Sequence, residues 1–185
     1  MKSYIFLDID GVLNGHKNYQ EHDEAEAEAN GYSIPDDHVR HLQVNQEVDL
    51  LARIAGAEVV VSSTWRLLYR NHWQDLIDLL RRRGLTATIA GATPNLSIST
   101  HMAERGDEIT AWLMKHAGEK ARIVVLDDDS DMTAVKWWHV RTETSVGLGL
   151  NHALEAAKIL LDGPVWERAR VVPPRESFGY NMGQG

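Results

Sequence analysis

Two groups of aspartates each follow a short apolar run of the kind that forms a buried strand. Asp8 and Asp10 come after "YIFL", and the segment "DDDSD" at Asp127–Asp131 comes after "RIVVL". If the two strands are neighbours in a parallel sheet, their carboxylates meet at one edge, where like charges repel unless a cation lies between them. Oxygen ligands without histidine or cysteine favour Mg²⁺. The two groups therefore predict a magnesium site.

Other interpretations of the aspartates are weaker. The first pair followed by glycine would also suit an ordinary turn. In the second group, Asp127, Asp129 and Asp131 occupy positions one, three and five of a calcium-binding EF-hand loop. That loop needs a glycine where Met132 stands and a bidentate glutamate where Trp138 stands. The calcium interpretation therefore fails.

The elements that would hold these carboxylates alternate between strand and helix. Strands are expected at 4–7, 59–61 and 123–126, with weaker signals at 86–90 and 137–140. Between them lie apolar stripes at helical spacing: Val44, Val48, Leu51 and Ala55; Trp73, Leu76, Ile77 and Leu80; Ile109, Trp112, Leu113 and His116; Leu150, Leu154, Ala157 and Leu161. This alternation predicts an α/β fold, with a mostly parallel five-stranded sheet between two layers of helices and a site beyond the carboxyl ends of its strands.

Length and composition predict a single domain. The chain has 185 residues, of which 43% are hydrophobic, and no cysteine. We assign residues 1–162 to the domain, 15–43 to a small cap or flap insertion within it, and 163–185 to an extended tail. No apolar run resembles a signal peptide or a membrane span, which predicts a cytoplasmic protein. A net charge of -8 argues against nucleic-acid binding through a broad positively charged surface.

Three segments resemble the motifs of the haloacid dehalogenase-like (HAD) superfamily. They are "FLDIDGVLN", "VVVSSTW" and "VVLDDDSD", and the resemblance spans roughly residues 3 to 150 in the expected order. The chain looks closest to phage HAD domains related to the phosphatase part of polynucleotide kinase-phosphatases, through "SSTWR", "RGDEITAWL" and a late "GL". The resemblance implies a three-layer Rossmann-like fold, a magnesium ion and chemistry on phosphate esters.

The first motif would carry the reaction. By resemblance, Asp8 is the nucleophile that becomes an aspartyl phosphate, and Asp10 protonates the leaving oxygen and later activates water. Gly11 lets the backbone turn without a Cβ, so that substrate can approach. Dehalogenases of the superfamily lack an acid at the second position and transport ATPases usually carry threonine there. Asp10 therefore favours a phosphatase.

The remaining motifs would bind phosphate. By resemblance, Ser62 hydrogen-bonds a phosphoryl oxygen, with Ser63 as the alternative if the register shifts by one residue. Arg105 is expected to offset charge on the transferring group, although lysine is commoner at that place in the family. Arg66 is assigned to a further phosphate or a nucleic-acid backbone, and a solvated helix start explains it equally well.

The metal ligands expected from the resemblance are Asp8, Asp10 and Asp128. Asp127 is expected to be the partner of Asp128 by orienting a bound water or a basic side chain, and the two residues could exchange roles.

These residues together predict a Mg²⁺-dependent phosphomonoesterase acting on a nucleotide or on the 3′-phosphate of a nucleic-acid end. A small insertion would leave the site open to a polymer, whereas the acidic surface would repel one. The expected partner is a phosphorylated small molecule or a nucleic-acid end, with no membrane and no obligate protein partner. A non-catalytic binding module and a sugar phosphomutase are the alternatives, and no kinase P-loop is present.

Overall fold

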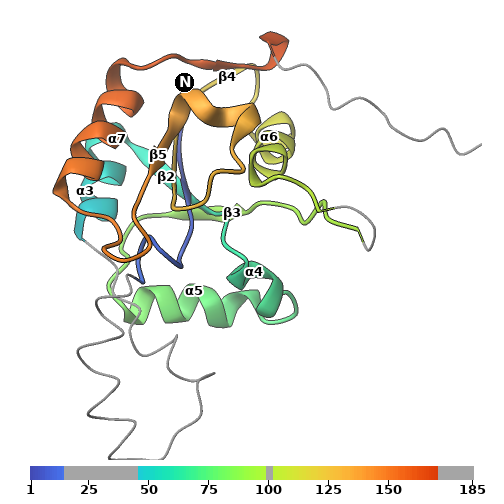
Figure 1. Ribbon diagram of the computed structural model, residues 1–185, viewed down its shortest axis with the longest axis vertical. Helices are drawn as coiled ribbons and strands as arrows, with labels where there is room; N and C mark the ends of the chain where they lie inside the picture. Colours follow the sequence, from blue (N-terminus) through green and yellow to red (C-terminus); the bar gives the residue numbers. More distant parts are fainter. Residues whose placement is uncertain (15–45, 99–101, 171–185) are drawn as a thin grey trace, which may run out of the picture.

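Six strands form one open sheet with helices on both faces (Figure 1). The computed structural model describes residues 1–14, 46–98 and 102–170, so the predicted insertion at 15–43, residue Val44 and most of the predicted tail lie outside the described residues. The elements are β1 (Lys2–Leu7), α3 (Gln46–Ala55), β2 (Ala57–Val61), α4 (Trp65–Leu68), α5 (Trp73–Arg82), β3 (Ile89–Ala92), α6 (Arg105–His116), β4 (Lys120–Asp127), η2 (Thr133–Trp138), β5 (His139–Arg141), α7 (Leu150–Asp162), β6 (Trp166–Glu167) and η3 (Arg168–Arg170).

The strand order confirms the predicted sheet. Five strands run parallel in the order β3-β2-β1-β4-β5, and the two-residue β6 adds an antiparallel sixth strand beside β4. The chain first builds outward from β1 to β2 and β3, and then returns through α6 to place β4 on the other side of β1. This reversal lies between β1 and β4, and in open α/β sheets a ligand site forms at such a switch point.

The side chains of β1 explain why the sheet is covered on both faces. Ile5 and Leu7 belong to a buried cluster that also contains residues of α3, α5 and α7. Tyr4 and Phe6, which point the other way, pack with α6 and η2, and both rings meet Trp112 edge-on at 4.9 and 5.5 Å between centroids. A strand buried on both faces reads as a continuous apolar run, as "YIFL" does.

The buried face of α7 differs from the prediction. The buried side chains are Ala153, Ala156 and Leu160, whereas Leu150 and Leu154 are 65% and 61% exposed. Figure 1 shows α7 running beside α3, and residues of both helices belong to the same buried cluster. Alanine side chains let α7 approach this layer closely, so packing selected the face with the smaller residues rather than the leucines.

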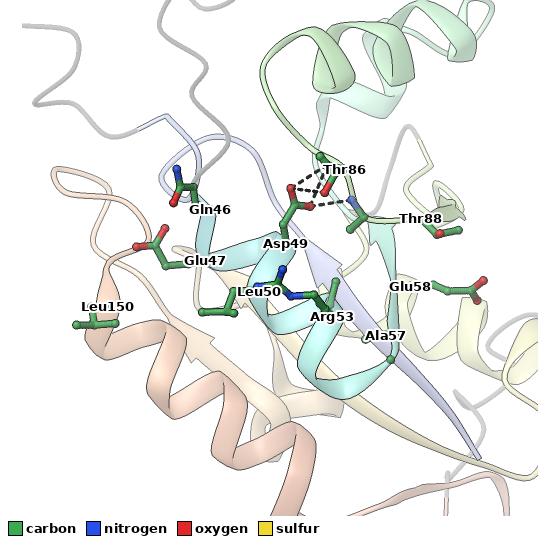
Figure 2. Close-up of a pocket in the computed structure, with 13 residues that line it drawn as sticks. Gln46, Glu47, Asp49, Leu50, Arg53, Ala57, Glu58, Thr86, Thr88 and Leu150 are labelled. Atoms are coloured by element: carbon green, nitrogen blue, oxygen red, sulfur yellow. Dashed lines mark hydrogen bonds between the residues drawn. The ribbon is translucent and has the colours of Figure 1, made fainter.

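Two strands begin later in the chain than predicted. The segment expected at 86–90 becomes a strand only from Ile89, because the Asp49 carboxylate accepts hydrogen bonds from the backbone N–H groups of Thr86 and Ala87 at 2.7–2.9 Å (Figure 2). These donors are therefore not available to a sheet ladder. The segment expected at 137–140 begins as the 3-10 helix η2, and its strand β5 starts at His139.

Among the described residues, no helix has the length and apolarity needed to cross a membrane.

Candidate active site

The strand register places the first aspartate between two other motif residues. Leu7 pairs with Leu126 of β4, and the ladder continues as the Asp8 N–H donates to the Leu126 carbonyl at 3.0 Å. On the other side, the Ser62 N–H donates to the Leu7 carbonyl at 2.9 Å. Asp8 therefore lies between Ser62 and Asp127, at the carboxyl end of the strand where the sheet order reverses.

Three carboxylates converge at this point. Asp8, Asp127 and Asp128 each offer an oxygen within 4.8 Å of the others, and the first two are 6% and 0% exposed. Asp127 Oδ2 is buried and accepts no hydrogen bond from any residue that the structure describes. A buried carboxylate oxygen without a donor is costly unless a cation approaches it. The group therefore fits a hard divalent ion, as the sequence predicted for this edge.

Burial, followed by the negative charge of Asp8, raises the pKa of Asp127 to about 8. Two contacts act against this shift: the Asp129 N–H donates to Asp127 Oδ1 at 2.9 Å, and Arg105 Nε lies 3.8 Å from Asp127 Oδ2. Burial is also the main cause of a raised pKa at Asp8. Without a cation, the ionised forms of both carboxylates are thus disfavoured in the folded protein.

These shifts predict how stability depends on pH. A folded-state pKa raised above the unfolded value stabilises the protein at low pH, and this contribution is lost as the pH rises from about 4 towards 8. In EDTA, we expect the Tm of the wild type to fall between pH 5 and 8 by at least about 3 °C more than the Tm of Asp127→Asn. Thermal melts at several pH values test this.

Mg²⁺ should reverse the effect, because it binds the ionised carboxylates. The gain in Tm from Mg²⁺ should therefore be larger at pH 8 than at pH 6. An equal gain at both pH values, or an equal pH slope in the wild type and Asp127→Asn without metal, would contradict the expected shift.

The side chain of Asp10 does not belong to the cluster of three carboxylates formed by Asp8, Asp127 and Asp128. Its Oδ2 accepts a hydrogen bond from Trp65 Nε1 at 2.7 Å, and its Oδ1 accepts one from Asn14 Nδ2 at 3.3 Å. The structure thus does not bring the Asp10 carboxylate to the other predicted metal ligands. No sequence signal indicated that the indole N–H of Trp65 reaches a residue 55 positions away.

The two serines of the second motif have different surroundings. Ser62 Oγ is buried and has no hydrogen-bond partner among the described residues, so it is free to meet a ligand. The Ser63 hydroxyl instead hydrogen-bonds Asp8, and it also accepts a hydrogen bond from the main-chain N–H of Trp65 at 3.3 Å. Ser62 is therefore the better placed of the two for a phosphoryl oxygen.

Arg105 begins helix α6 and points into the site. Its Nη1 is buried and makes no hydrogen bond to the described residues, while its Nε faces Asp127. Asp131, in the same acidic segment as Asp127 and Asp128, does not join their group. Its Oδ2 accepts from the Arg105 N–H at 2.9 Å, and its carbonyl accepts from the Gly106 N–H at 3.0 Å. Asp131 thus fixes the start of the helix that carries the cation.

Arg66 is held inside the protein. All five of its N–H groups donate, to the carbonyls of Ser62, Ser63, Thr93 and Pro94 and to the carboxylate of Glu108. Both members of the ion pair are almost fully buried. The predicted contact of Arg66 with a substrate phosphate would require one of these bonds to break. Its observed contacts instead join the second motif to α6.

Gly11 lies directly against the carboxylate of Asp128. It has φ +69, and a Cβ at this position would overlap the carboxylate of Asp128. Two threonines that the sequence did not single out complete the arrangement: Thr142 Oγ1 donates to the Gly11 carbonyl at 2.7 Å, and Thr144 Oγ1 donates to Asp128 Oδ2 at 2.6 Å. The glycine is therefore required both for its backbone conformation and for the space above it.

An open, mainly parallel sheet thus carries three converging carboxylates at its switch point, with a serine and an arginine beside them. The family model described as the HAD domain in Swiss Army Knife RNA repair proteins matches residues 4–153, and the chain belongs to this family. No curated protein and no solved structure gave a significant match.

Proposed function

We propose that the protein is a Mg²⁺-dependent phosphomonoesterase that works through an aspartyl-phosphate intermediate. The observation that carries the proposal is the convergence of Asp8, Asp127 and Asp128 at the end of β1 and β4, with Arg105 as a buried cation beside them. A buried group of like charges next to a free hydroxyl and a guanidinium suits a dianionic phosphate held by a metal.

The reaction would proceed in two displacements. A carboxylate oxygen of Asp8 attacks phosphorus, the bond from phosphorus to the ester oxygen breaks, and Asp10 gives its proton to the departing oxygen. Water then attacks the aspartyl phosphate, Asp10 takes the proton from that water, and inorganic phosphate leaves as the Asp8 carboxylate is restored. Atoms and charges balance, and both carboxylates return to their starting states.

The phosphoryl group would be held by residues around the nucleophile. Ser62 Oγ and Arg105 Nη1 are buried donors without hydrogen-bond partners among the described residues, which makes them available to phosphoryl oxygens. Asp8 and Asp128 would hold the ion, with Asp127 as their partner. When bound, Mg²⁺ supplies Lewis-acid charge that offsets the negative charge of the carboxylates and of the phosphoryl group.

The proposed substrate is a nucleotide or a nucleic-acid end with a 3′-phosphate. Support comes from the family, whose description names RNA repair proteins. A local feature also fits a polymer: a hollow of about 590 Å³ next to Asp128 is lined by Arg141, whose Nε is held by the Asp128 carbonyl at 2.9 Å. An arginine anchored at one nitrogen keeps its other N–H groups for an anion such as a second phosphate.

The assay that tests the function is phosphate release with Mg²⁺ from four substrates: a 3′-phosphorylated oligonucleotide, a 3′-mononucleotide, a 5′-mononucleotide and p-nitrophenyl phosphate. We expect release from all four and the highest kcat/KM for a 3′-phosphate. Binding of the oligonucleotide without release from any substrate would favour a non-catalytic module. Transfer of the phosphoryl group to an added sugar, in place of water, would favour a phosphomutase.

A further inference from the structure

Trp65 makes a direct contact with the residue assigned to proton transfer. It is the last residue of the segment "VVVSSTW" and the first residue of the short helix α4, and it is 4% exposed. Its indole N–H donates to Asp10 Oδ2 at 2.7 Å, which is short for an N–H···O bond. Trp65 also belongs to the buried cluster that contains Ile5 and Leu7, so its ring is fixed by the same core that fixes strand β1.

The contact restricts how Asp10 can hold a proton. The indole nitrogen of Trp65 can only donate a hydrogen bond and cannot accept one. The side-chain amide N–H of Asn14 donates to the other carboxylate oxygen of Asp10 at 3.3 Å. A proton carried by Asp10 therefore cannot lie along either of these two bonds. It must occupy one of the remaining lone-pair directions, away from the indole and the amide.

We propose that Trp65 is a positioning residue, whose indole N–H fixes the Asp10 carboxylate and directs its proton toward the leaving oxygen of the substrate. This inference rests on the proposed function, because it assigns a role within that reaction. The indole N–H of Trp65 donates to Asp10 and not to the nucleophile Asp8. Its effect is exerted through Asp10, by holding one rotamer of a side chain that is only partly buried.

The chemistry of the leaving group provides a selective test. Formation of the aspartyl phosphate from an alkyl ester needs a proton on the departing oxygen, whereas p-nitrophenolate departs readily without one. The value of kcat/KM covers the steps up to this first irreversible event. A change that misplaces Asp10 should therefore lower kcat/KM for an alkyl ester much more than for p-nitrophenyl phosphate.

The experiment compares Trp65→Phe with the wild type in Mg²⁺. Phenylalanine keeps an aromatic ring in the core, but it removes the N–H donor together with part of the buried indole volume, so a control for the lost volume is needed. We expect kcat/KM for the 3′-phosphorylated oligonucleotide to fall roughly 10- to 100-fold, a part of the usual contribution of a general acid, and kcat/KM for p-nitrophenyl phosphate to fall less than about threefold.

Trp112→Phe is the matched control for loss of a buried indole. Trp112 is 5% exposed and packs against Tyr4 and Phe6 on the other face of the sheet, without a contact to Asp10. This variant should lower the Tm by a similar amount and leave the ratio of the two kcat/KM values unchanged. The same ratio change in Trp112→Phe would mean that general loosening of the core is the cause, and would overturn the inference.

A second readout does not depend on turnover. In a ¹⁵N–¹H spectrum, Asp10→Ala should shift the indole N–H resonance of Trp65, identified by its loss in Trp65→Phe, and leave that of Trp112 in place. An unchanged resonance would refute the hydrogen bond. In the kinetics, equal losses on both substrates, or no loss on either, would refute the positioning role while leaving the proposed function intact. A wild type that releases phosphate from neither substrate would refute both.

Discussion

Asp8→Asn should abolish phosphate release while leaving the protein folded. The amide has nearly the shape of the carboxylate, but it is a poor nucleophile and carries no negative charge to bind a metal. Loss of a covalent nucleophile costs on the order of 10⁴- to 10⁶-fold in kcat. We therefore expect the activity of Asp8→Asn on p-nitrophenyl phosphate with Mg²⁺ to fall to the background rate.

The stability of this variant separates lost chemistry from lost structure. Burial raises the pKa of Asp8, so replacing this carboxylate with a neutral amide removes an unfavourable ionisation. At pH 8 in EDTA, the Tm of Asp8→Asn should be equal to or higher than that of the wild type. A markedly lower Tm would mean that the lost activity reports unfolding.

Asp129→Asn is the matched control for the change of one charge. Asp129 is exposed in the same acidic segment, and its contact with Asp127 is made by its main-chain N–H, which the substitution keeps. Its activity should stay within about threefold of the wild type, because an exposed charge interacts weakly through water. If Asp8→Asn retains turnover, or if Asp129→Asn is equally inactive, Asp8 is not the nucleophile.

Gly11→Ala should weaken the binding of Mg²⁺ and leave the sheet intact. The new Cβ would overlap the Asp128 carboxylate, which Thr144 holds in place with a hydrogen bond at 2.6 Å. Relief of the overlap requires the Asp128 carboxylate to leave its present position beside Gly11. We expect the affinity for Mg²⁺ to fall by about 10- to 100-fold, the range seen when the orientation of a metal ligand is lost. Titration calorimetry and the dependence of activity on Mg²⁺ concentration measure this.

The chain offers a control for the backbone conformation of this glycine. Gly118 has φ +72, close to that of Gly11, and a Cβ built on it meets no atom within 4 Å. Gly118→Ala should therefore pay the same backbone cost, about 1–2 kcal/mol of stability, and bind Mg²⁺ as the wild type does. Equal Mg²⁺ affinities in Gly11→Ala and Gly118→Ala would show that the overlap of a Cβ at position 11 with Asp128 does not affect the binding of the ion.

Much of the fold could be predicted because its signals are local. The apolar runs at β1, β2 and β4 are continuous, and glycine, which is typical of a helix end, stands at Gly84 and Gly163, just after α5 ends at Arg82 and α7 ends at Asp162. The buried face of α7 could not be predicted in this way. Leucines and alanines both recur at helical spacing there, and only the neighbouring layer decides which set is buried.

The candidate site, like the fold, could be predicted from the sequence only in part. The sequence by itself determined which carboxylates follow apolar strands, because those runs are continuous in the chain. The structure then showed that β1 and β4 are neighbours, which brings the two sets of carboxylates to one edge of the sheet. Only the tertiary structure decided that Asp10 binds Trp65 rather than the other carboxylates, and that every donor of Arg66 is used inside the protein. Those outcomes depend on side-chain partners 55 and 42 positions away. A residue's type and spacing specify its own chemistry, but the packed neighbour that occupies its hydrogen bonds is known only once distant elements have been brought together.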